Sequence, residues 1–200
     1  CDVGKKDQIF SMVEKTVEEF GTVDILVNNA QGFGTEANPR TSTIPTPIED
    51  TDDDEWDYTF RTGASATLWG MQAVFPHMKE TGSGKIINIG SMMSIFGTGY
   101  ASAYAASKGG VVQYTKSCAV AWAKYNVQVN CILPGWIVTD MTNDFKTKFP
   151  DRYAMIVERT PAERWGVPKD LAGTSVFLSS GLSDFVTGVS IAVDGGYSVW

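Results

Sequence analysis

The sequence contains few of the residues that mark several large protein classes. It has three cysteines, Cys1, Cys118 and Cys131, and a single histidine, His77. Without a CxxC spacing, these cysteines argue against a disulfide framework, a zinc ribbon and a thioredoxin-type redox centre. No stretch approaches the roughly 20 apolar residues that a membrane helix needs, and no secretory signal opens the chain. We therefore expect a cytoplasmic protein with reduced thiols and no membrane partner.

Motifs of other functional classes are also missing. There is no GxSxG elbow, and the single His77 is interpreted as the exposed end of a helix, so a Ser-His-Asp hydrolase is not supported. The acidic run at residues 49–55 lacks the glycine and spacing of an EF-hand, and acids are common before a helix N-terminus. We predict no metal site. The GSGK segment at residues 82–85 is similar to the end of a P-loop but lacks its upstream glycine, and we interpret it as a turn.

Positive charge is scarce relative to negative charge. The chain has 16 Lys and Arg against 23 Asp and Glu, which gives a net charge of −7. A surface of this sign repels polyanions, so we expect no nucleic-acid partner, and a small molecule is the better candidate ligand. Hydrophobic residues make up 43% of the 200 residues and aromatics 12%, enough for a substantial core within a single domain spanning residues 1–200.

Short apolar runs alternate with longer amphipathic patterns along the chain. Strands are predicted at residues 23–27, 85–89, 127–133 and 189–193. Helices are predicted at residues 6–20, 54–78, 103–125 and 168–179, a loop at 32–50, and an irregular or partly helical excursion at 143–166. The alternation predicts an α/β fold, a doubly wound parallel sheet with right-handed crossovers and helices on both faces.

The usual beginning of such a nucleotide-binding sheet does not occur in this sequence. A glycine-rich turn normally joins its first strand to its first helix, and neither GxGxxG nor GxxxGxG is present. The run at residues 23–27 is apolar on both faces, as in a central strand, yet nothing before it is available to pair with its other edge. We therefore expect about 60 further residues, carrying the N-terminal cofactor-binding strands, upstream of Cys1.

A tyrosine and a lysine stand four positions apart in the predicted helix at residues 103–125. Because positions i and i+4 share a helix face, Lys108 can hold its ammonium group near the Tyr104 hydroxyl and favour the phenolate. Ser91 follows the strand at 85–89 and can donate a hydrogen bond to the same substrate oxygen. The three side chains would form a proton-transfer site. Taken alone, however, a YxxxK pattern is more often a packed tyrosine and a solvated lysine.

Several further motifs, in order and spacing, resemble those of the short-chain dehydrogenase/reductase family across essentially all of the chain. Asp2-Val3 resembles the pair that contacts adenine, Asn28-Asn29-Ala30 resembles the NNAG element, and Gly90-Ser91 with Tyr104 and Lys108 resembles the catalytic set. The stretch from Pro134 to Thr139 resembles PGxxxT, and Asp194-Gly195-Gly196 resembles the closing turn. The resemblance implies a Rossmann-like fold whose N-terminal strands are missing from this sequence.

The resemblance also implies a reaction, the transfer of a hydride between NAD or NADP and a secondary alcohol or ketone. Tyr104 would be the general acid/base, Ser91 would position the carbonyl, and Lys108 would lower the tyrosine pKa and hold the nicotinamide ribose. The cofactor would be bound by Asp2, Val3, Asn28, Ala30, Tyr104, Lys108, Pro134, Gly135, Ile137 and Thr139. The substrate would contact Ser91 and Tyr104. From their positions after Ser91 and in the PGxxxT stretch, Met93 and Trp136 are candidates to line an apolar part of the substrate pocket, although such side chains are more often simple core.

Two positions depart from the family pattern. Gly63 stands where the family usually has a helix-bending asparagine; its backbone can permit the same distortion, but it has no side chain to order a relay water. Gln31 replaces the last glycine of NNAG, and Gly32 is expected to take over its role. Two alternatives therefore stay open: a non-catalytic nucleotide sensor or scaffold on this fold, and a relative that uses nucleotide for epimerisation.

The predicted helix at residues 103–125 carries more apolar surface than one sheet face needs. Its apolar positions include Val111, Val112, Tyr114, Ala119 and Trp122. The resemblance implies that this helix and the preceding one form the interface of a homodimer or homotetramer. The identity of the substrate, the choice between NAD and NADP and the preferred direction are not readable from the sequence.

Overall fold

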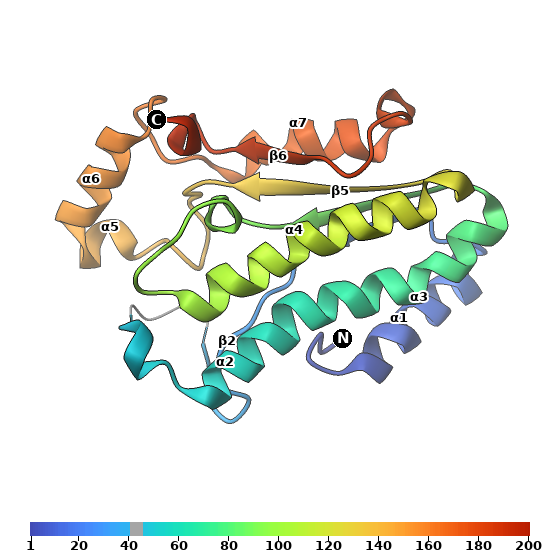
Figure 1. Ribbon diagram of the computed structural model, residues 1–200, viewed down its shortest axis with the longest axis horizontal. Helices are drawn as coiled ribbons and strands as arrows, with labels where there is room; N and C mark the ends of the chain where they lie inside the picture. Colours follow the sequence, from blue (N-terminus) through green and yellow to red (C-terminus); the bar gives the residue numbers. More distant parts are fainter. Residues whose placement is uncertain (41–45) are drawn as a thin grey trace.

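A four-stranded parallel sheet forms the centre of the protein in the computed structural model, which describes residues 1–40 and 46–200 (Figure 1). Its strands, in spatial order, are β1 (Ile25–Asn28), β4 (Gly84–Ile89), β5 (Val127–Pro134) and β6 (Ser190–Val193). The main helices are α1 (Lys6–Phe20), α3 (Ala66–Thr81), α4 (Ser102–Trp122) and α7 (Pro168–Ser179). The predicted α/β architecture is confirmed, and the bounds of α1 and α7 are those predicted.

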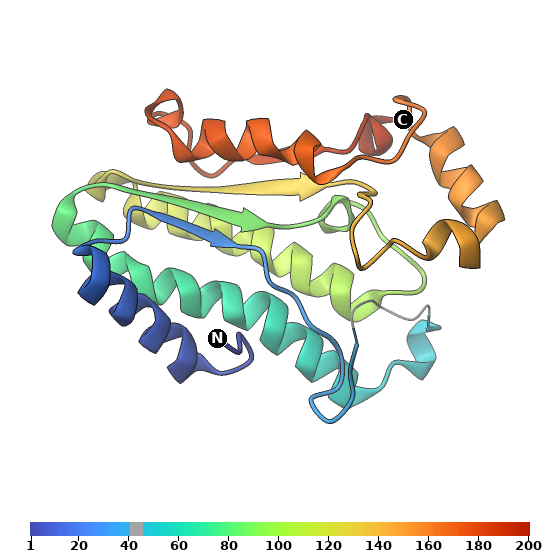
Figure 2. The same cartoon turned by 180° about the vertical axis from the view of Figure 1, so that it is seen from behind.

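The strands run in one direction, so their carboxyl ends meet at one edge of the sheet. Val27 pairs with Ile87, and Ile132 of β5 pairs with Ile89 on one side and Ile191 on the other. The arrowheads of the blue, green and yellow strands in Figure 2 point to the same side, where the segments following β4 and β5 gather. Ligands of open α/β sheets bind at this edge.

Alternation of side chains along β5 distributes the core over both faces of the sheet. Val127 and Val129 lie in the same buried cluster as α1 and α3, whereas Ile132 packs with Ile87 and with Leu178 of α7. Helix α7 thus covers the face opposite to α1, α3 and α4 (Figures 1 and 2). The sheet order continues in one direction from β1 to β6, so the connection through α7 has the opposite hand to those through α3 and α4. The prediction of right-handed crossovers throughout was therefore wrong for the last one.

The predicted helix at residues 54–78 is divided into three parts. It begins as α2 (Asp53–Phe60), continues as the π-helical segment η2 (Arg61–Ser65), and becomes α3. The Asp52 side chain caps α2 by accepting a hydrogen bond from the amide of Glu55 at 3.0 Å, which explains the acidic run as a helix start. The GSGK segment is the expected turn, because Gly82 ends α3 in a left-handed conformation and β4 begins at Gly84.

Short elements occupy the segments predicted to be irregular. A two-stranded ladder, β2 (Phe33–Gly34) with β3 (Pro39–Arg40), and the 3-10 helix η1 (Ile48–Asp50) lie in the predicted loop at 32–50, of which residues 41–45 lie outside the described part. The excursion at 143–166 contains α5 (Phe145–Lys148) and α6 (Pro150–Arg159). The remaining 3-10 helices are η3 (Met92–Ser94), η4 (Ala123–Tyr125), η5 (Gly181–Ser183) and η6 (Tyr197–Val199).

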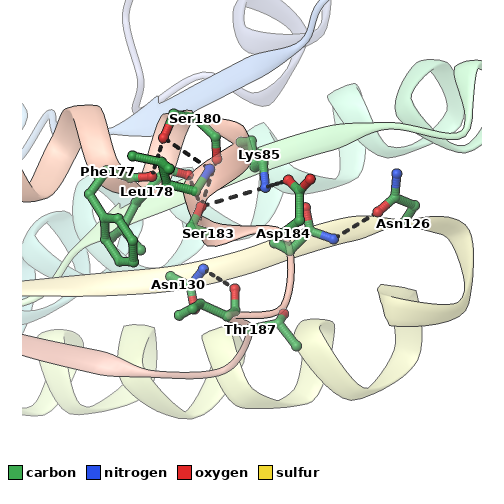
Figure 3. Close-up of polar contacts among 12 residues, drawn as sticks. Lys85, Asn126, Asn130, Phe177, Leu178, Ser180, Ser183, Asp184 and Thr187 are labelled. Atoms are coloured by element: carbon green, nitrogen blue, oxygen red, sulfur yellow. Dashed lines mark hydrogen bonds and ion pairs between the residues drawn. The ribbon is translucent and has the colours of Figure 1, made fainter.

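A lysine at the amino-terminal end of β4 forms an ion pair with the segment after α7 (Figure 3). We call this pair, Lys85 and Asp184, the latch. Lys85 Nζ lies 2.7 Å from Asp184 Oδ1 and 3.5 Å from the hydroxyl of Ser183. The Lys85 side chain is 11% exposed, whereas the Asp184 side chain is 68% exposed, so the lysine depends on this partner more than the aspartate does. The latch lies at the edge of the sheet opposite to the carboxyl ends of the strands.

Two sequence-based expectations about surfaces are corrected by the packing. His77 is not at an exposed helix end, because its Nε2 lies 3.5 Å from Glu14 Oε1 of α1 and its side chain is only 23% exposed. Val111, Val112 and Ala119 are buried in the protein's own core, so these three are not available to a partner subunit. Among the described residues, no helix combines the length and apolar composition needed to cross a membrane.

Candidate active site

Ser91 is held at the carboxyl edge of the sheet by the start of a short helix. The sequence leaves β4 at Gly90 and turns directly into η3, of which Ser91 is the N-cap. The Met93 amide donates to Ser91 Oγ at 3.1 Å, and the Ser91 amide donates to Ser94 Oγ at 3.1 Å. Because Ser91 Oγ accepts a backbone hydrogen bond, its own proton remains available for another acceptor.

Tyr104 and Lys108 extend from α4 toward the same place. The Ser91 side chain lies close enough to the Tyr104 hydroxyl to act on its pKa, so the expected trio is assembled between α4 and the segment after β4. Lys108 Nζ lies 5.7 Å from the centre of the Tyr104 ring and donates to the carbonyl of Ile89 at 2.7 Å. The Phe33 ring also packs against the site, with its centroid 5.5 Å from that of Tyr104. The i,i+4 spacing therefore brings the lysine under the tyrosine, as predicted.

Burial controls the protonation of this trio. It raises the pKa of Tyr104, and the hydrogen bond with Ser91 only partly opposes this shift. Burial also lowers the pKa of Lys108 to about 8, since only 4% of its surface is exposed. The expected lowering of the tyrosine pKa by Lys108 is not present in this arrangement. Tyr104 is a neutral phenol at pH 7, which is the form that can give a proton to a carbonyl oxygen.

The segment after β5 forms the opposite wall of the edge. Gly135 packs against Asp194. A Cβ added to Gly135 would lie 2.7 Å from the Asp194 Cα, so the position has no room for a side chain. Ile137 forms an isolated parallel bridge with Gly166, and the Thr142 hydroxyl donates to the Ile137 carbonyl at 2.7 Å. Thr139 is exposed. The predicted residues Pro134, Gly135, Ile137 and Thr139 thus line one loop at the carboxyl edge.

Asn28 lies at the end of β1 and begins a chain of buried polar groups. Its Nδ2 donates to Asn88 Oδ1 at 2.8 Å, and Asn88 Nδ2 donates to the Thr115 hydroxyl at 3.0 Å. This side chain is therefore engaged within the protein, which leaves the backbone of Asn28 and the exposed Ala30 at the edge. Asn88 and Thr115 were not recognised from the sequence, because a single buried asparagine in a strand carries no local signal.

The first residues of the chain lie close to η2, just before the start of α3. Asp2 is exposed and its Oδ1 accepts a hydrogen bond from the Gly4 amide at 2.9 Å, while the Asp2 amide donates to Gln8 Oε1 at 2.8 Å. Val3 is half-buried against the cluster that contains Ile9 and Val13. A Cβ on Gly4 would lie 3.6 Å from the Thr62 side chain, so the predicted adenine-contacting pair approaches η2.

An aromatic cluster covers the substrate side of the site. Met92, Ile156, Trp165 and Tyr197 are buried in it, and Met93 and Trp136 pack on it half-buried, together with Phe96, Phe145, Tyr153 and Val157. Trp136 also lines a cavity of about 340 Å³ with Ile137 and Asp194. Tyr104 lines a separate recess of about 30 Å³ with Tyr100 and Thr51. That Met93 and Trp136 contact the substrate stays a prediction; the packing of α5 and α6 beside them was not predicted, because their sequence shows only an irregular pattern.

The two departures at Gly63 and Gln31 lie together. Gly63 is in the π-helical η2, so the expected distortion is present. The side-chain amide of Gln31 lies over Gly63 and donates from Nε2 to the carbonyl of Thr59 at 3.2 Å. Gly32 lies against Tyr58: a Cβ added to Gly32 would be 2.9 Å from the Tyr58 ring, so the position has no room for a side chain. The sequence showed each departure separately but not that they meet.

The residues present fit a nicotinamide dinucleotide. The Lys108 ammonium has three protons, of which one is given to Ile89, and the other two suit the hydroxyl oxygens of a ribose. Asn28 and Pro134 end their strands, and Ser91 follows the end of β4, at the carboxyl edge, which is the place where such folds bind nucleotides. In residues 1–40 and 46–200, no group of three or more His, Cys, Asp or Glu side chains is arranged to hold a metal ion.

Comparison with known proteins identifies the class. The family described as Enoyl-(Acyl carrier protein) reductase matches residues 1–198, and the chain belongs to the short-chain dehydrogenase/reductase family. It is an NAD(P)-dependent oxidoreductase that transfers a hydride between the cofactor and a secondary alcohol or ketone.

Particular relatives are sugar-acid enzymes. The 2-dehydro-3-deoxy-D-gluconate 5-dehydrogenase of Escherichia coli (strain K12) is 41% identical over 198 residues, 98% of this chain and 74% of that protein. The 5-keto-D-gluconate 5-reductase of the same strain is 40% identical over 200 residues, 99% of this chain and 74% of that protein. The solved structure of a gluconate 5-dehydrogenase from Burkholderia cenocepacia J2315, in complex with NADP and tartrate, has a TM-score of 0.91 at 33% identity, covering 100% of this chain and 74% of its own.

Proposed function

We propose that the protein interconverts a hydroxyl and a keto group on the carbon chain of a sugar acid. The observation that carries the proposal is the assembled Ser91, Tyr104 and Lys108 site in a chain about 40% identical to two sugar-acid oxidoreductases. The tartrate complex of the Burkholderia protein adds support, because tartrate is itself a hydroxylated carboxylic acid.

In this proposal Tyr104 is the general acid in ketone reduction and the general base in alcohol oxidation. The nicotinamide, when bound, supplies or accepts the hydride at the reacting carbon. Tyr104 gives its proton to the carbonyl oxygen, and the Ser91 hydroxyl donates a hydrogen bond to that oxygen and stabilises the charge developing on it. The raised pKa of Tyr104 supports the reductive direction at neutral pH, because the acid is already protonated.

The remaining predicted residues would hold the cofactor and the substrate. Lys108, anchored by Ile89, would bind the nicotinamide ribose, and the Ile137 backbone with Thr139 would bind the carboxamide. The adenosine half would lie along Asp2, Val3, Asn28 and Ala30, and Pro134 and Gly135 would contact the nicotinamide end. Met93 and Trp136 would cover the substrate beside Ser91.

We further propose a cytoplasmic homodimer or homotetramer that uses the outward face of α4. Val120 is 85% exposed and Tyr114 is 37% exposed on this helix. A Cβ added to Gly109 or Gly110 would meet no neighbouring atom within 4 Å, so the backbone of α4 is open to close approach by a second helix at these positions. These features support an interface on α4 to which the buried Val111, Val112 and Ala119, suggested from the sequence, do not contribute.

The test is the oxidation of NADH and NADPH with 5-keto-D-gluconate, followed by absorbance at 340 nm, in wild type and Tyr104→Phe. We expect kcat to fall by about 10²- to 10⁴-fold in the variant, the usual contribution of a positioned acid, with cofactor affinity within twofold. Cofactor affinity is measured by nicotinamide fluorescence. Unchanged turnover in Tyr104→Phe would refute the role of the tyrosine, and cofactor binding without turnover of any ketone in wild type would favour the nucleotide sensor.

A further inference from the structure

Arg152 of α6 is a cation held by aromatic rings and without an acidic partner in the part of the chain that the structure describes. Its guanidinium carbon lies 4.1 Å from the centre of the Tyr100 ring and 5.7 Å from that of Phe145. Arg159 of the same helix also stacks on rings and forms no ion pair among the described residues, whereas Arg40, Arg61 and Arg164 each pair with a carboxylate. Stacking on ring faces fixes the guanidinium plane and leaves its N–H donors available.

The two rings that hold Arg152 connect it to the substrate side of the site. Tyr100 precedes the start of α4 and lines the same recess as Tyr104. Phe145 packs on Trp136, with ring centroids 5.7 Å apart. Figure 1 shows α5 and α6 at the same end of the molecule as the start of α4. Arg152 thus contacts one ring that lines the recess of Tyr104 and another that packs on Trp136.

The segment around Arg152 has the opposite charge to the protein as a whole. From Phe145 to Arg159 the sequence contains four basic and two acidic side chains, whereas the chain carries a net charge of −7. Lys148 is paired with Asp144, just before this segment, so the excess of positive charge that remains to attract an anion is small and Arg152 is, among the described residues, its unpaired part nearest Tyr100. Because a carboxylate accepts two parallel hydrogen bonds from one guanidinium, it is the anion that this arrangement fits best.

We propose that Arg152 binds the carboxylate of the substrate and thereby determines which end of a sugar acid is presented to Tyr104. The inference rests on the proposed sugar-acid function and deepens it, since it makes the enzyme selective for acids over neutral polyols. Arg152 is then a specificity-determining residue that acts in substrate binding and has no part in proton transfer.

The test compares a charged substrate with its neutral isostere. KM and kcat are measured for D-gluconate and D-gluconamide in wild type, Arg152→Met, Arg152→Lys and Arg159→Met. Arg159 is a matched control, because it lies seven residues later in α6 and also stacks on an aromatic ring, with its guanidinium carbon 4.3 Å from the centre of the Tyr197 ring, but it stacks on neither Tyr100 nor Phe145. Thermal unfolding confirms that each variant is folded.

We expect Arg152→Met to raise KM for D-gluconate by about 10- to 100-fold, the usual effect of losing a hydrogen bond between charged groups. KM for D-gluconamide should change less than twofold, and Arg152→Lys should recover part of the loss. Equal losses for both compounds, or the same loss in Arg159→Met, would overturn the assignment and leave the proposed function intact.

Failure of the proposed function gives a different result. If wild type turns over neither compound, the sugar-acid function is wrong, and the Arg152 assignment is decided by binding alone. D-Gluconate and tartrate are then titrated against the cofactor-saturated protein by the fluorescence of its six tryptophans, one of which, Trp136, packs on Phe145. Binding by wild type that is lost in Arg152→Met supports the assignment, and no binding or equal binding refutes it.

Discussion

The side-chain amide of Gln31 occupies the space that any side chain at position 63 would need. A Cβ on Gly63 would lie 3.1 Å from both Cδ and Nε2 of Gln31, and closer still to Oε1. Gln31 Nε2 donates to the carbonyls of Gly32 at 2.9 Å and Thr59 at 3.2 Å, so the amide is fixed in this position. Buried Oε1 has no hydrogen-bond partner in the part of the chain described. The two departures from the family pattern are therefore one packing unit.

This relationship predicts strong coupling between the two positions. Gly63→Asn alone should destabilise the protein by about 1–3 kcal/mol, because the new side chain overpacks a filled site. Gln31→Gly alone should also destabilise it, since two hydrogen bonds to backbone carbonyls are lost. The double variant should recover at least about 1 kcal/mol relative to the sum of the single effects. Urea unfolding of all four proteins measures the cycle, and additive effects would contradict the coupling.

Periodicity predicted the main helices and strands, but neither the short elements within residues 32–50 and 143–166 nor the way the elements meet. The bounds of α1 and α7 were predicted because each has an apolar face of helical period and a glycine or proline at a boundary. The sequence singled out Ser91, Tyr104 and Lys108 because their signals are local: Ser91 directly follows a strand, and Tyr104 and Lys108 are four positions apart in one helix. The contact of Gln31 with Gly63 joins positions 32 apart, and the hand of the α7 connection depends on which face of β5 is covered. Neither leaves a local pattern in the sequence.

The latch between Lys85 and Asp184 should contribute to stability and not to catalysis. Asp184→Ala should lower the free energy of unfolding by about 1–2 kcal/mol, because it leaves a buried ammonium without its partner. Turnover should be unchanged within twofold, since six residues of strand place Lys85 about 20 Å from Ser91. The control is Lys85→Met combined with Asp184→Ala, which removes the unpaired charge and should recover most of the stability. A loss of turnover without a loss of stability would argue against this role.

The three thiols should react at clearly different rates with a disulfide reagent such as Ellman's reagent. Cys1 is exposed, Cys118 is half-buried, and Cys131 is fully buried in β5. Burial raises the pKa of Cys131 to about 11, so very little of it is thiolate at neutral pH. We expect one fast and one slower reaction in the native protein, and the third only in denaturant. Cys131→Ala identifies the thiol that reacts only in denaturant, and rapid reaction of all three in native conditions would contradict the buried position.

Lys108 should impose a pH-dependent cost on stability. The pKa of its side chain falls from 10.5 to about 8 on folding because of burial. The folded protein therefore binds this proton more weakly than the unfolded chain does, so the cost is complete below pH 8 and decreases as the pH rises to 10.5. Relative to Lys108→Met, which carries no charge, wild type should gain about 3 kcal/mol of stability between pH 7 and pH 10.5.

The measurement is urea unfolding of wild type and Lys108→Met at several pH values across this range. Comparing the difference between the two proteins removes the contribution of all other titrating groups. Lys108→Met also loses the hydrogen bond to the Ile89 carbonyl, which lowers the stability of the variant by the same amount at every pH. The decisive quantity is therefore how the difference in unfolding free energy changes with pH, and not whether it is positive or negative at one pH. A flat difference for Lys108→Met would mean that the lysine is solvated in the folded protein, and its place beneath Tyr104 would then have to be reconsidered.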